Sequence, residues 1–184
     1  DNRTLSDNSL TSIFCDSKGN IWVGSYNEGL NFINRDGSVF PHFRHVTGAN
    51  GLNDNRVLSM MEDNEGIVWI GTDGGGVNLL NQSTGKFTYL KNIPGNKNSL
   101  GGNNVTMILE GDSEEIWLGT WGAGISVYNK RNKKFRHLRH DPNNPNSLSM
   151  DDVWTMIEDR EKNIWIATYG AGLDKYEPAT GKFT

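Results

Sequence analysis

The sequence predicts an all-β protein in which four successive β-propeller blades are each a four-stranded antiparallel meander. Tryptophan recurs every 47 or 48 residues, at Trp22, Trp69, Trp117 and Trp165. A leucine stands 17 residues before each tryptophan, and a phenylalanine stands 18 residues after it. Three markers that keep the same spacing four times are typical of propellers and other repeat arrays, not of one irregular domain.

Short apolar runs inside each repeat predict the individual strands. In the second repeat the runs are VLSMMED, IVWIGT, VNLLNQ and KFTYLKN, and the turn sequences NEG, DGGG and STG separate them. None of the runs has the length or the 3.6-residue period of a helix. We therefore expect a single propeller segment over residues 1–184, with repeats at approximately 5–51, 52–99, 100–147 and 148–184. The last repeat stops at GKFT, so its outer strand is expected to be cut short.

Composition disfavours several classes of partner. The net charge of −4 argues against nucleic acid, because a nucleic-acid-binding surface has to neutralise phosphates. No apolar run approaches the roughly 18 residues that a membrane-spanning helix requires. The single cysteine, Cys15, is expected to be a small buried residue of a strand.

Residues that recur in all or most copies are expected to form the frame of the fold. The four repeated tryptophans are interpreted as wedges buried between neighbouring blades, not as ligand residues. A glycine seven residues after each tryptophan is expected to supply positive φ or room for a close backbone approach. Asp16, Asp63 and Asp159 precede the first turn of their repeats, where a carboxylate can cap backbone N–H groups.

The motifs DSKGNIWVGS, DNEGIVWIGT and NQSTGKFTYL resemble bacterial two-component regulator propeller repeats, and the likeness covers essentially the whole chain. The third and fourth repeats depart from the pattern where Glu114 and Lys162 replace Gly19 and Gly66, which weakens those turns. The resemblance implies the periplasmic sensor region of a hybrid two-component regulator that detects polysaccharide breakdown products. It further implies a piece of a larger, seven- or eight-bladed propeller whose partners are the remaining blades and a transmembrane histidine kinase.

Candidate ligand-binding residues come from a variable position in the constant frame. The residue four positions after each tryptophan varies as Tyr26, Asp73, Trp121 and Tyr169. It lies on the face where the long polar connections between repeats emerge, and variable loops on a rigid frame are the usual place of recognition. Trp154 falls outside the fourfold tryptophan pattern and is added to the candidates. Aromatic faces near amides and carboxylates suit a sugar ring. The alternative is that these aromatic residues pack on a neighbouring blade or module.

Arg56, Asn104 and Asp152 are further candidates, because they precede the first strand of their repeats on the same face. They form either a ring of hydrogen-bonding groups or, together with their neighbours Asn55, Asn103 and Asp151, simple turn caps.

We expect a non-enzymatic sensor, without catalytic residues, cofactor or metal site, that recognises an oligosaccharide. The sequence has no GxSxG elbow, HExxH motif or P-loop. The four histidines are expected to lie away from the loop-rich face, with His137 and His140 on opposite faces of an outer strand. A propeller enzyme of the lyase or glycosidase type and a purely architectural module remain alternatives. Because four blades of a larger ring leave two open ends, the isolated chain is expected to form a homodimer.

Overall fold

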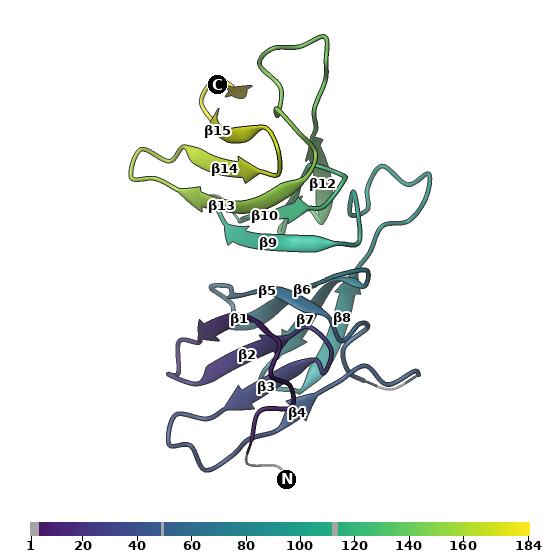
Figure 1. Cartoon of the computed structure of the whole chain (residues 1–184), viewed down its shortest axis with the longest axis vertical. Helices are drawn as coiled ribbons and strands as arrows, with labels where there is room; N and C mark the ends of the chain where they lie inside the picture. The colour runs from purple at the N-terminus through teal and green to yellow at the C-terminus, as the bar shows by residue number, and fades with distance from the viewer. Residues whose placement is uncertain (1–3, 49, 112–113) are drawn as a thin grey trace. The chain divides into compact units, whose positions relative to one another are not determined.

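The computed structural model describes residues 4–48, 50–111 and 114–184, and its regular secondary structure is entirely β. Sixteen strands form four antiparallel sheets of four strands each, and in every sheet neighbouring strands are consecutive in sequence (Figure 1). This confirms the predicted four-stranded meanders. Each sheet corresponds to one repeat, so the sheets are called repeats one to four below.

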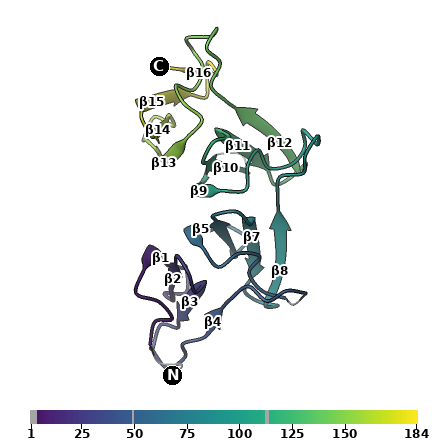
Figure 2. The same ribbon diagram turned by 45° about the vertical axis from the view of Figure 1, so that its right-hand side comes forward.

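The bounds of the strands follow the repeat. The strands of repeats one and two are β1 (Leu10–Cys15), β2 (Ile21–Ser25), β3 (Leu30–Ile33), β4 (His42–Phe43), β5 (Val57–Glu62), β6 (Ile67–Thr72), β7 (Gly76–Asn81) and β8 (Lys86–Leu90). The strands of repeats three and four are β9 (Val105–Glu110), β10 (Glu115–Thr120), β11 (Ile125–Asn129), β12 (Lys134–Leu138), β13 (Val153–Glu158), β14 (Ile164–Thr168), β15 (Gly172–Glu177) and β16 (Lys182–Phe183). The outer strands β4 and β16 have only two residues each, and Figure 2 shows both beside the third strands of their sheets.

The chain divides into two compact units, each made of two repeats. Unit 1 comprises Asp1–Lys91 and unit 2 comprises Asn92–Thr184. In unit 1, Trp22 of repeat one shares a buried core with Leu52 and Val57 of repeat two. In unit 2, Trp117 of repeat three shares a core with Leu148 and Val153 of repeat four. Within each unit, the tryptophan of one repeat therefore packs with the leucine and valine of the next.

The predicted burial is confirmed for three of the four repeated tryptophans and is wrong for the fourth. Trp22, Trp69 and Trp117 are buried, whereas Trp165 is only half-buried. No further repeat follows Trp165 in this sequence, so no leucine and valine pair covers its ring. The prediction for Cys15 is also wrong: Cys15 is exposed at the end of β1, on a face of repeat one that no other repeat in this structure covers.

The glycines seven residues after the tryptophans have the role predicted for them. Gly29, Gly76, Gly124 and Gly172 have φ values of 81°, 80°, 66° and 93°. A side chain on Gly29 would collide with the carbonyl oxygen of Phe43, and one on Gly124 would collide with that of Leu138. Positive φ therefore requires glycine in all four turns, and a close backbone approach adds a second reason at Gly29 and Gly124.

The repeated aspartates join the first turn to the tryptophan. The Trp22 Nε1–H donates to Asp16 Oδ2 over 2.9 Å, and the backbone N–H groups of Lys18 and Asn20 donate to Asp16 Oδ1. Asp63 and Trp69 form the same bond at 2.9 Å, as do Asp159 and Trp165 at 2.8 Å. The expected turn cap is thus present, and it has a second role, fixing the indole, that the sequence analysis missed.

Repeat three departs from this arrangement, because Gly111 stands where the other repeats have aspartate. A Cβ at Gly111 would lie 2.8 Å from Trp117 Nε1, so the chain passes too close to the indole for a side chain. The Arg136 guanidinium lies 5.0 Å from the centroid of the Trp117 ring, within the range of a cation–π contact.

Candidate functional site

The four variable candidate positions occupy the same place in their repeats. The backbone N–H of Tyr26 donates to Ser9 O, that of Asp73 to Arg56 O, that of Trp121 to Asn104 O and that of Tyr169 to Asp152 O, at 2.8–2.9 Å. Each acceptor precedes the first strand of its own repeat. The turn between the second and third strands is therefore held beside the start of the first strand, which brings together the two sets of candidate residues.

Trp154 owes its position to a β-bulge in the first strand. In repeat four the pairing of β13 with β14 shifts between Val153 and Thr155, and Trp154 is the unpaired residue of this bulge. The same shift occurs in the other repeats, where the corresponding residues are Thr11, Leu58 and Thr106. A bulge changes the direction of a side chain without interrupting the sheet. Repeat four alone uses this position to present a large aromatic ring.

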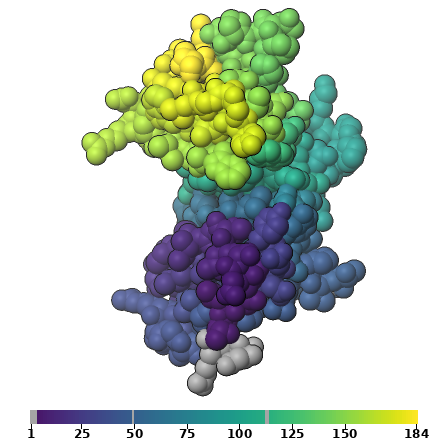
Figure 3. Space-filling view, viewed as in Figure 1, coloured from purple at the N-terminus to yellow at the C-terminus, as the bar shows by residue number. Residues whose placement is uncertain are grey.

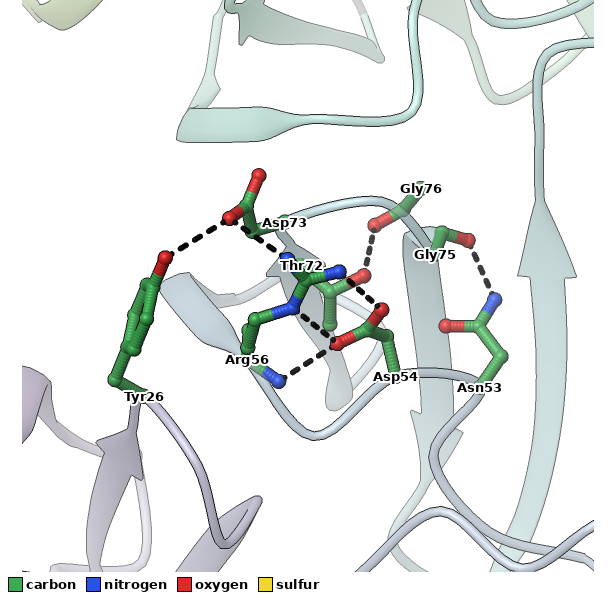
Figure 4. Close-up of polar contacts among 8 residues, drawn as sticks. All are labelled: Tyr26, Asn53, Asp54, Arg56, Thr72, Asp73, Gly75 and Gly76. Atoms are coloured by element: carbon green, nitrogen blue, oxygen red, sulfur yellow. Dashed lines mark hydrogen bonds and ion pairs between the residues drawn. The ribbon is translucent and has the colours of Figure 1, made fainter.

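In unit 1 the candidate residues form a chain of polar contacts (Figure 4). Tyr26 Oη donates to Asp73 Oδ2 over 3.4 Å, and Arg56 NH1 donates to the same oxygen over 3.3 Å. Arg56 also holds Asp54 through Nε at 3.2 Å and NH2 at 3.0 Å. Asp54 was not among the predicted residues, although its place two residues before Arg56 could have marked it as a partner.

Arg56 is held by ion pairs with the carboxylates of Asp54 and Asp73. Burial alone would raise the pKa of Asp54, but the hydrogen bonds and charge of Arg56 outweigh it, and the pKa of Asp54 lies below its usual value. The bond to Asp54 likewise raises the pKa of Arg56. One guanidinium between two carboxylates leaves this network with a net negative charge. The network can therefore form hydrogen bonds with a ligand, but it has no unpaired positive charge that would attract an anion.

Two further side chains shape the glycine-rich turn that carries Asp73. Thr72 Oγ1 donates to Gly76 O over 3.0 Å, and Asn53 Nδ2 donates to Gly75 O over 2.6 Å (Figure 4). Both side chains satisfy backbone carbonyls, so this turn is held by the frame and does not depend on a ligand.

In unit 2 the equivalent positions form an aromatic cluster of Trp121, Trp154 and Tyr169. The ring centroids of Trp121 and Tyr169 are 5.2 Å apart at an interplanar angle of 50°, and those of Trp121 and Trp154 are 6.3 Å apart at 74°. The three side chains are 40%, 61% and 64% exposed, respectively. Rings at these separations touch one another, so they form a continuous exposed patch, not a cage with room for a cation between them.

The remaining candidates divide into caps and neighbours of the cluster. The side-chain oxygens of Asn55, Asn103 and Asp151 accept the backbone N–H of His45, Asn92 and His140 at 2.7–2.8 Å, so they cap the connections between repeats. Asp152 and Asn104 lie one residue further on and hold Tyr169 and Trp121 through their carbonyls. A Cβ on Gly122, next to Trp121, would lie 3.9 Å from Asp152 Oδ1. A carboxylate therefore borders the aromatic cluster.

The expectation that all four histidines lie away from the loop-rich face is wrong for two of them, whereas His42 and His137 lie on the outer strands β4 and β12. His45 and His140 belong to the connections between repeats, and their Nδ1 atoms lie 2.8 and 2.9 Å from the carbonyl oxygens of Leu52 and Leu148. His140 also lies beyond the end of β12, so it does not share that strand with His137. Asn92 Nδ2 makes the same bond to Leu100 O. His45, Asn92 and His140 recur every 47 or 48 positions, and this spacing was the signal that could have revealed their shared structural role. Each side chain bonds the carbonyl oxygen of the repeated leucine, and we call this bond the leucine clasp.

Two hollows of the described structure lie elsewhere. One, of about 730 Å³, lies on repeat one and is lined by residues including Leu5, Leu10, Ile13 and Ile21. The other, of about 420 Å³, lies on repeat four and is lined by residues including Ile157, Trp165 and Leu173. Neither contains a predicted ligand-binding residue.

The described residues offer neither a metal site nor a membrane-spanning helix. They contain no group of three or more His, Cys, Asp or Glu side chains placed to hold a metal ion. Nor do they contain a helix that is long and apolar enough to cross a membrane.

Solved structures similar to this chain include extracellular domains of hybrid two-component systems of B. thetaiotaomicron. The BT4673 domain is 28% identical, with a TM-score of 0.81 over 97% of this chain and 25% of its own. The BT3049 domain is 23% identical, with a TM-score of 0.83 over 98% and 24%. This chain therefore spans about a quarter of their length. Virginiamycin B lyase from Staphylococcus aureus shares the fold at 16% identity, with a TM-score of 0.69 over 96% of this chain and 54% of its own.

Sequence comparisons agree with the structural ones. No curated protein matches the sequence. The family model described as "two component regulator propeller" matches residues 4–27, 51–74 and 147–170, which are the starts of repeats one, two and four. Repeat three, where Gly111 and Glu114 replace the usual aspartate and glycine, is not matched. Three segments of this chain thus match two-component regulator propeller repeats, and its sheets are folded as blades of a β-propeller.

Proposed function

We propose that this chain is part of the extracytoplasmic sensor domain of a hybrid two-component signalling protein, where it recognises an oligosaccharide. Binding would then be relayed through the rest of the protein to a transmembrane histidine kinase. The family of its repeats and its similarity to extracellular domains of such systems support the sensor role and the periplasmic location.

One observation supports a carbohydrate as the ligand, namely the exposed cluster of Trp121, Trp154 and Tyr169. An aromatic ring can cover the apolar C–H face of a sugar, while nearby polar groups bond the hydroxyls at its rim. The cluster offers a continuous aromatic surface, and the carboxylate of Asp152 lies at its border. Because a carboxylate repels anions, a neutral oligosaccharide suits this surface better than an acidic one.

A propeller enzyme is the second candidate, because a lyase shares the fold. At 16% identity this likeness extends to the fold alone. Two of the histidines that could serve an enzyme on the loop-rich face, His45 and His140, instead hold leucine carbonyls of the frame. The sensor reading is therefore preferred.

Titration calorimetry with a panel of neutral oligosaccharides tests the proposal. For a sugar that binds, Trp121→Ala should weaken binding about 5- to 30-fold, because stacking contributes on the order of 1–2 kcal/mol. The affinity should change little between low and high salt, since charge is not the main attraction.

The matched control is Tyr89→Ala, because Tyr89 has the same 40% exposure as Trp121 but lies on the outer strand β8. This variant should bind as the unchanged chain does. Equal affinity of the Trp121→Ala variant and the unchanged chain would exclude the cluster as the binding surface.

A further inference from the structure

The turn between the third and fourth strands of repeat three carries more cations than the same turn of the other repeats. Residues 130–134, which lead from β11 into β12, have the sequence KRNKK. The corresponding residues are QSTGK in repeat two and PATGK in repeat four, and repeat one has RDGSV. The added positive charge therefore belongs to repeat three, and residues 130–134 are called the basic turn below.

Ion pairs within repeat three neutralise only part of this charge. Lys130 Nζ lies 3.3 Å from Glu110 Oε1, and Arg136 NH2 lies 2.9 Å from Glu115 Oε2. The carbonyl of Glu114 accepts the Lys130 N–H at 2.9 Å, so the first turn of the repeat adjoins the basic turn. Three exposed cations remain to which the described part of the chain offers no ion pair: Arg131, Lys133 and Lys134. They outnumber the two acidic residues in the sequence of the adjoining turn.

Hydrogen bonds fix the backbone of the basic turn. The Lys133 N–H donates to Asn129 O over 2.9 Å, and the Asn132 N–H donates to Asn129 Oδ1 over 3.0 Å. The Lys134 N–H in turn donates to Asn132 Oδ1 over 2.9 Å. The three unpaired cations therefore start from a defined backbone at the exposed end of a hairpin.

Lys133 occupies a position that the fold would rather give to glycine. Its φ of 57° lies in the left-handed region, where repeats two and four have Gly85 and Gly181. The left-handed Lys162 of repeat four at least forms an ion pair with Glu158, whereas Lys133 forms none among the described residues. A side chain kept in an unfavourable conformation without a structural reason points to a function.

The basic turn and the aromatic cluster lie at opposite ends of β11. Trp121 precedes this strand, and the basic turn follows it. In repeat four the first turn likewise lies at the end of its sheet away from Tyr169, and Figure 3 shows this turn, in yellow-green, projecting from the surface. A contact made by the basic turn therefore leaves the aromatic cluster accessible.

The outer edge of β12 is not available to a partner strand. Asn98 Oδ1 of the preceding connection accepts the Phe135 N–H at 2.9 Å, and His137 Nε2 lies 3.2 Å from Lys97 O. An acidic peptide therefore could not add to this sheet as a further strand. The basic turn also has no apolar side chain that could enter a membrane interior. A surface with many anionic groups suits it better, because each cation near such a surface contributes without a specific pocket.

We propose that the basic turn docks on an anionic lipid surface, with Arg131, Lys133 and Lys134 facing the lipid phosphates. The net charge of −4 of the whole chain does not prevent this contact, because charges more than about 10 Å away are largely screened at 0.1 M salt. The contact goes beyond the sensor role proposed above and does not depend on it.

Flotation with lipid vesicles tests the proposal. In about 0.1 M salt the unchanged chain should float with vesicles of phosphatidylcholine that contain about a third phosphatidylglycerol, and not with phosphatidylcholine alone. The double variant Arg131→Ser with Lys133→Gly gives the turn the residues that repeat two has at Ser83 and Gly85. It should lower the vesicle partition about 25-fold, or about 5-fold for each cation, with an unchanged circular dichroism spectrum. Salt at about 1 M should abolish the binding of the unchanged chain.

The matched control is Arg160→Ser with Lys162→Gly, which removes the same charge from the first turn of repeat four. Lys162 is paired with Glu158, and Glu161 follows Arg160, so this variant should bind the vesicles nearly as well as the unchanged chain. An equal loss in both double variants would overturn the proposal, because net charge alone would then govern binding. A chain that does not float with the anionic vesicles, or whose binding survives the change at Arg131 and Lys133, would contradict it as well. Binding to soluble polyglutamate but not to vesicles would assign the turn to an acidic polypeptide instead.

Discussion

The two units place different side chains at the same positions of the fold. We call these positions the slot: the turn between the second and third strands of each repeat, together with the residue before the first strand. In unit 1 the slot is filled by Tyr26, Asp73 and Arg56, which are joined by hydrogen bonds and an ion pair. In unit 2 the equivalent positions hold Trp121, Tyr169 and Asp152, and the Trp121 ring contacts both Tyr169 and the bulge residue Trp154. The backbone bonds that position these residues are the same in both units.

This difference separates the frame from the site. A residue that is bonded to the sheets by its backbone alone can change its side chain without altering the fold. The buried residues have no such freedom, because both units need the same tryptophan, leucine and valine to close their cores. Variants at frame positions should therefore have equal effects in the two units, and variants at slot positions should have unequal ones.

The largest expected effect is the loss of a frame tryptophan. Trp22→Ala in unit 1 and Trp117→Ala in unit 2 should each lower the free energy of unfolding by about 3–5 kcal/mol, because each removes a large buried aromatic side chain. Trp165→Ala should cost less, because this ring is only half-buried. Urea titration followed by circular dichroism measures all three. A loss below about 1 kcal/mol for either of the first two would show that the units do not share one frame.

The next effect concerns the aspartate that binds the indole. Asp16→Ala should destabilise the chain by about 1–3 kcal/mol, because it leaves the Trp22 Nε1–H and two backbone N–H groups without their acceptor. Asp36→Ala is the control, since Asp36 caps an exposed turn, and it should cost clearly less. If the two substitutions cost the same in urea titration, the bond to the indole contributes nothing of its own.

Acid should reveal the same bond in unit 2. Burial acts to raise the pKa of Asp159, but hydrogen bonds from Asn163, Trp165 and Glu161 outweigh it and lower the pKa to about 2. A carboxyl group with a depressed pKa in the folded state stabilises the fold above its unfolded pKa of 3.8, and this contribution is lost as the pH falls toward 2. The urea midpoint should therefore fall between pH 4 and pH 2. It should fall less steeply in Asp159→Asn, and identical slopes would contradict the assignment.

The smallest effect concerns the first turn of repeats three and four. Glu114 and Lys162 have φ values of 65° and 70°, in the left-handed region that favours glycine. Lys162→Gly should stabilise the chain by about 0.5–1 kcal/mol, because it relieves this backbone cost. It also removes an exposed ion pair with Glu158, which contributes little. The reverse change, Gly66→Lys in repeat two, should destabilise by a similar amount in the same urea titration.

Much of the fold could be predicted from sequence because one sequence repeat occurs four times in the chain. Periodic glycines and tryptophans located the turns and the inner cores, and the apolar runs located the strands. The burial of Trp165 and Cys15 could not be predicted in this way. Burial of a repeat depends on its neighbours, and these two residues lie on the faces that no other repeat of this sequence covers.

The candidate site was predictable in its positions but not in its contacts. The variable residue in a constant frame identified Tyr26, Asp73, Trp121 and Tyr169, and the structure places all four in equivalent turns. Three contacts of the site depend on how side chains meet between strands. They are the bond between Arg56 and Asp54, the bulge that directs Trp154, and the bonds of His45 and His140 to leucine carbonyls. A linear pattern contains no information on such geometry.

The most direct test of the central claim converts the slot of unit 2 into that of unit 1. The triple variant Trp121→Tyr, Asp152→Arg and Tyr169→Asp gives unit 2 the residue types that unit 1 has at Tyr26, Arg56 and Asp73. Titration calorimetry with a neutral oligosaccharide that binds the unchanged chain should show at least a 10-fold loss of affinity, on the order of 1.4 kcal/mol, with an unchanged melting temperature. Retained affinity, or a melting temperature that falls, would contradict the account.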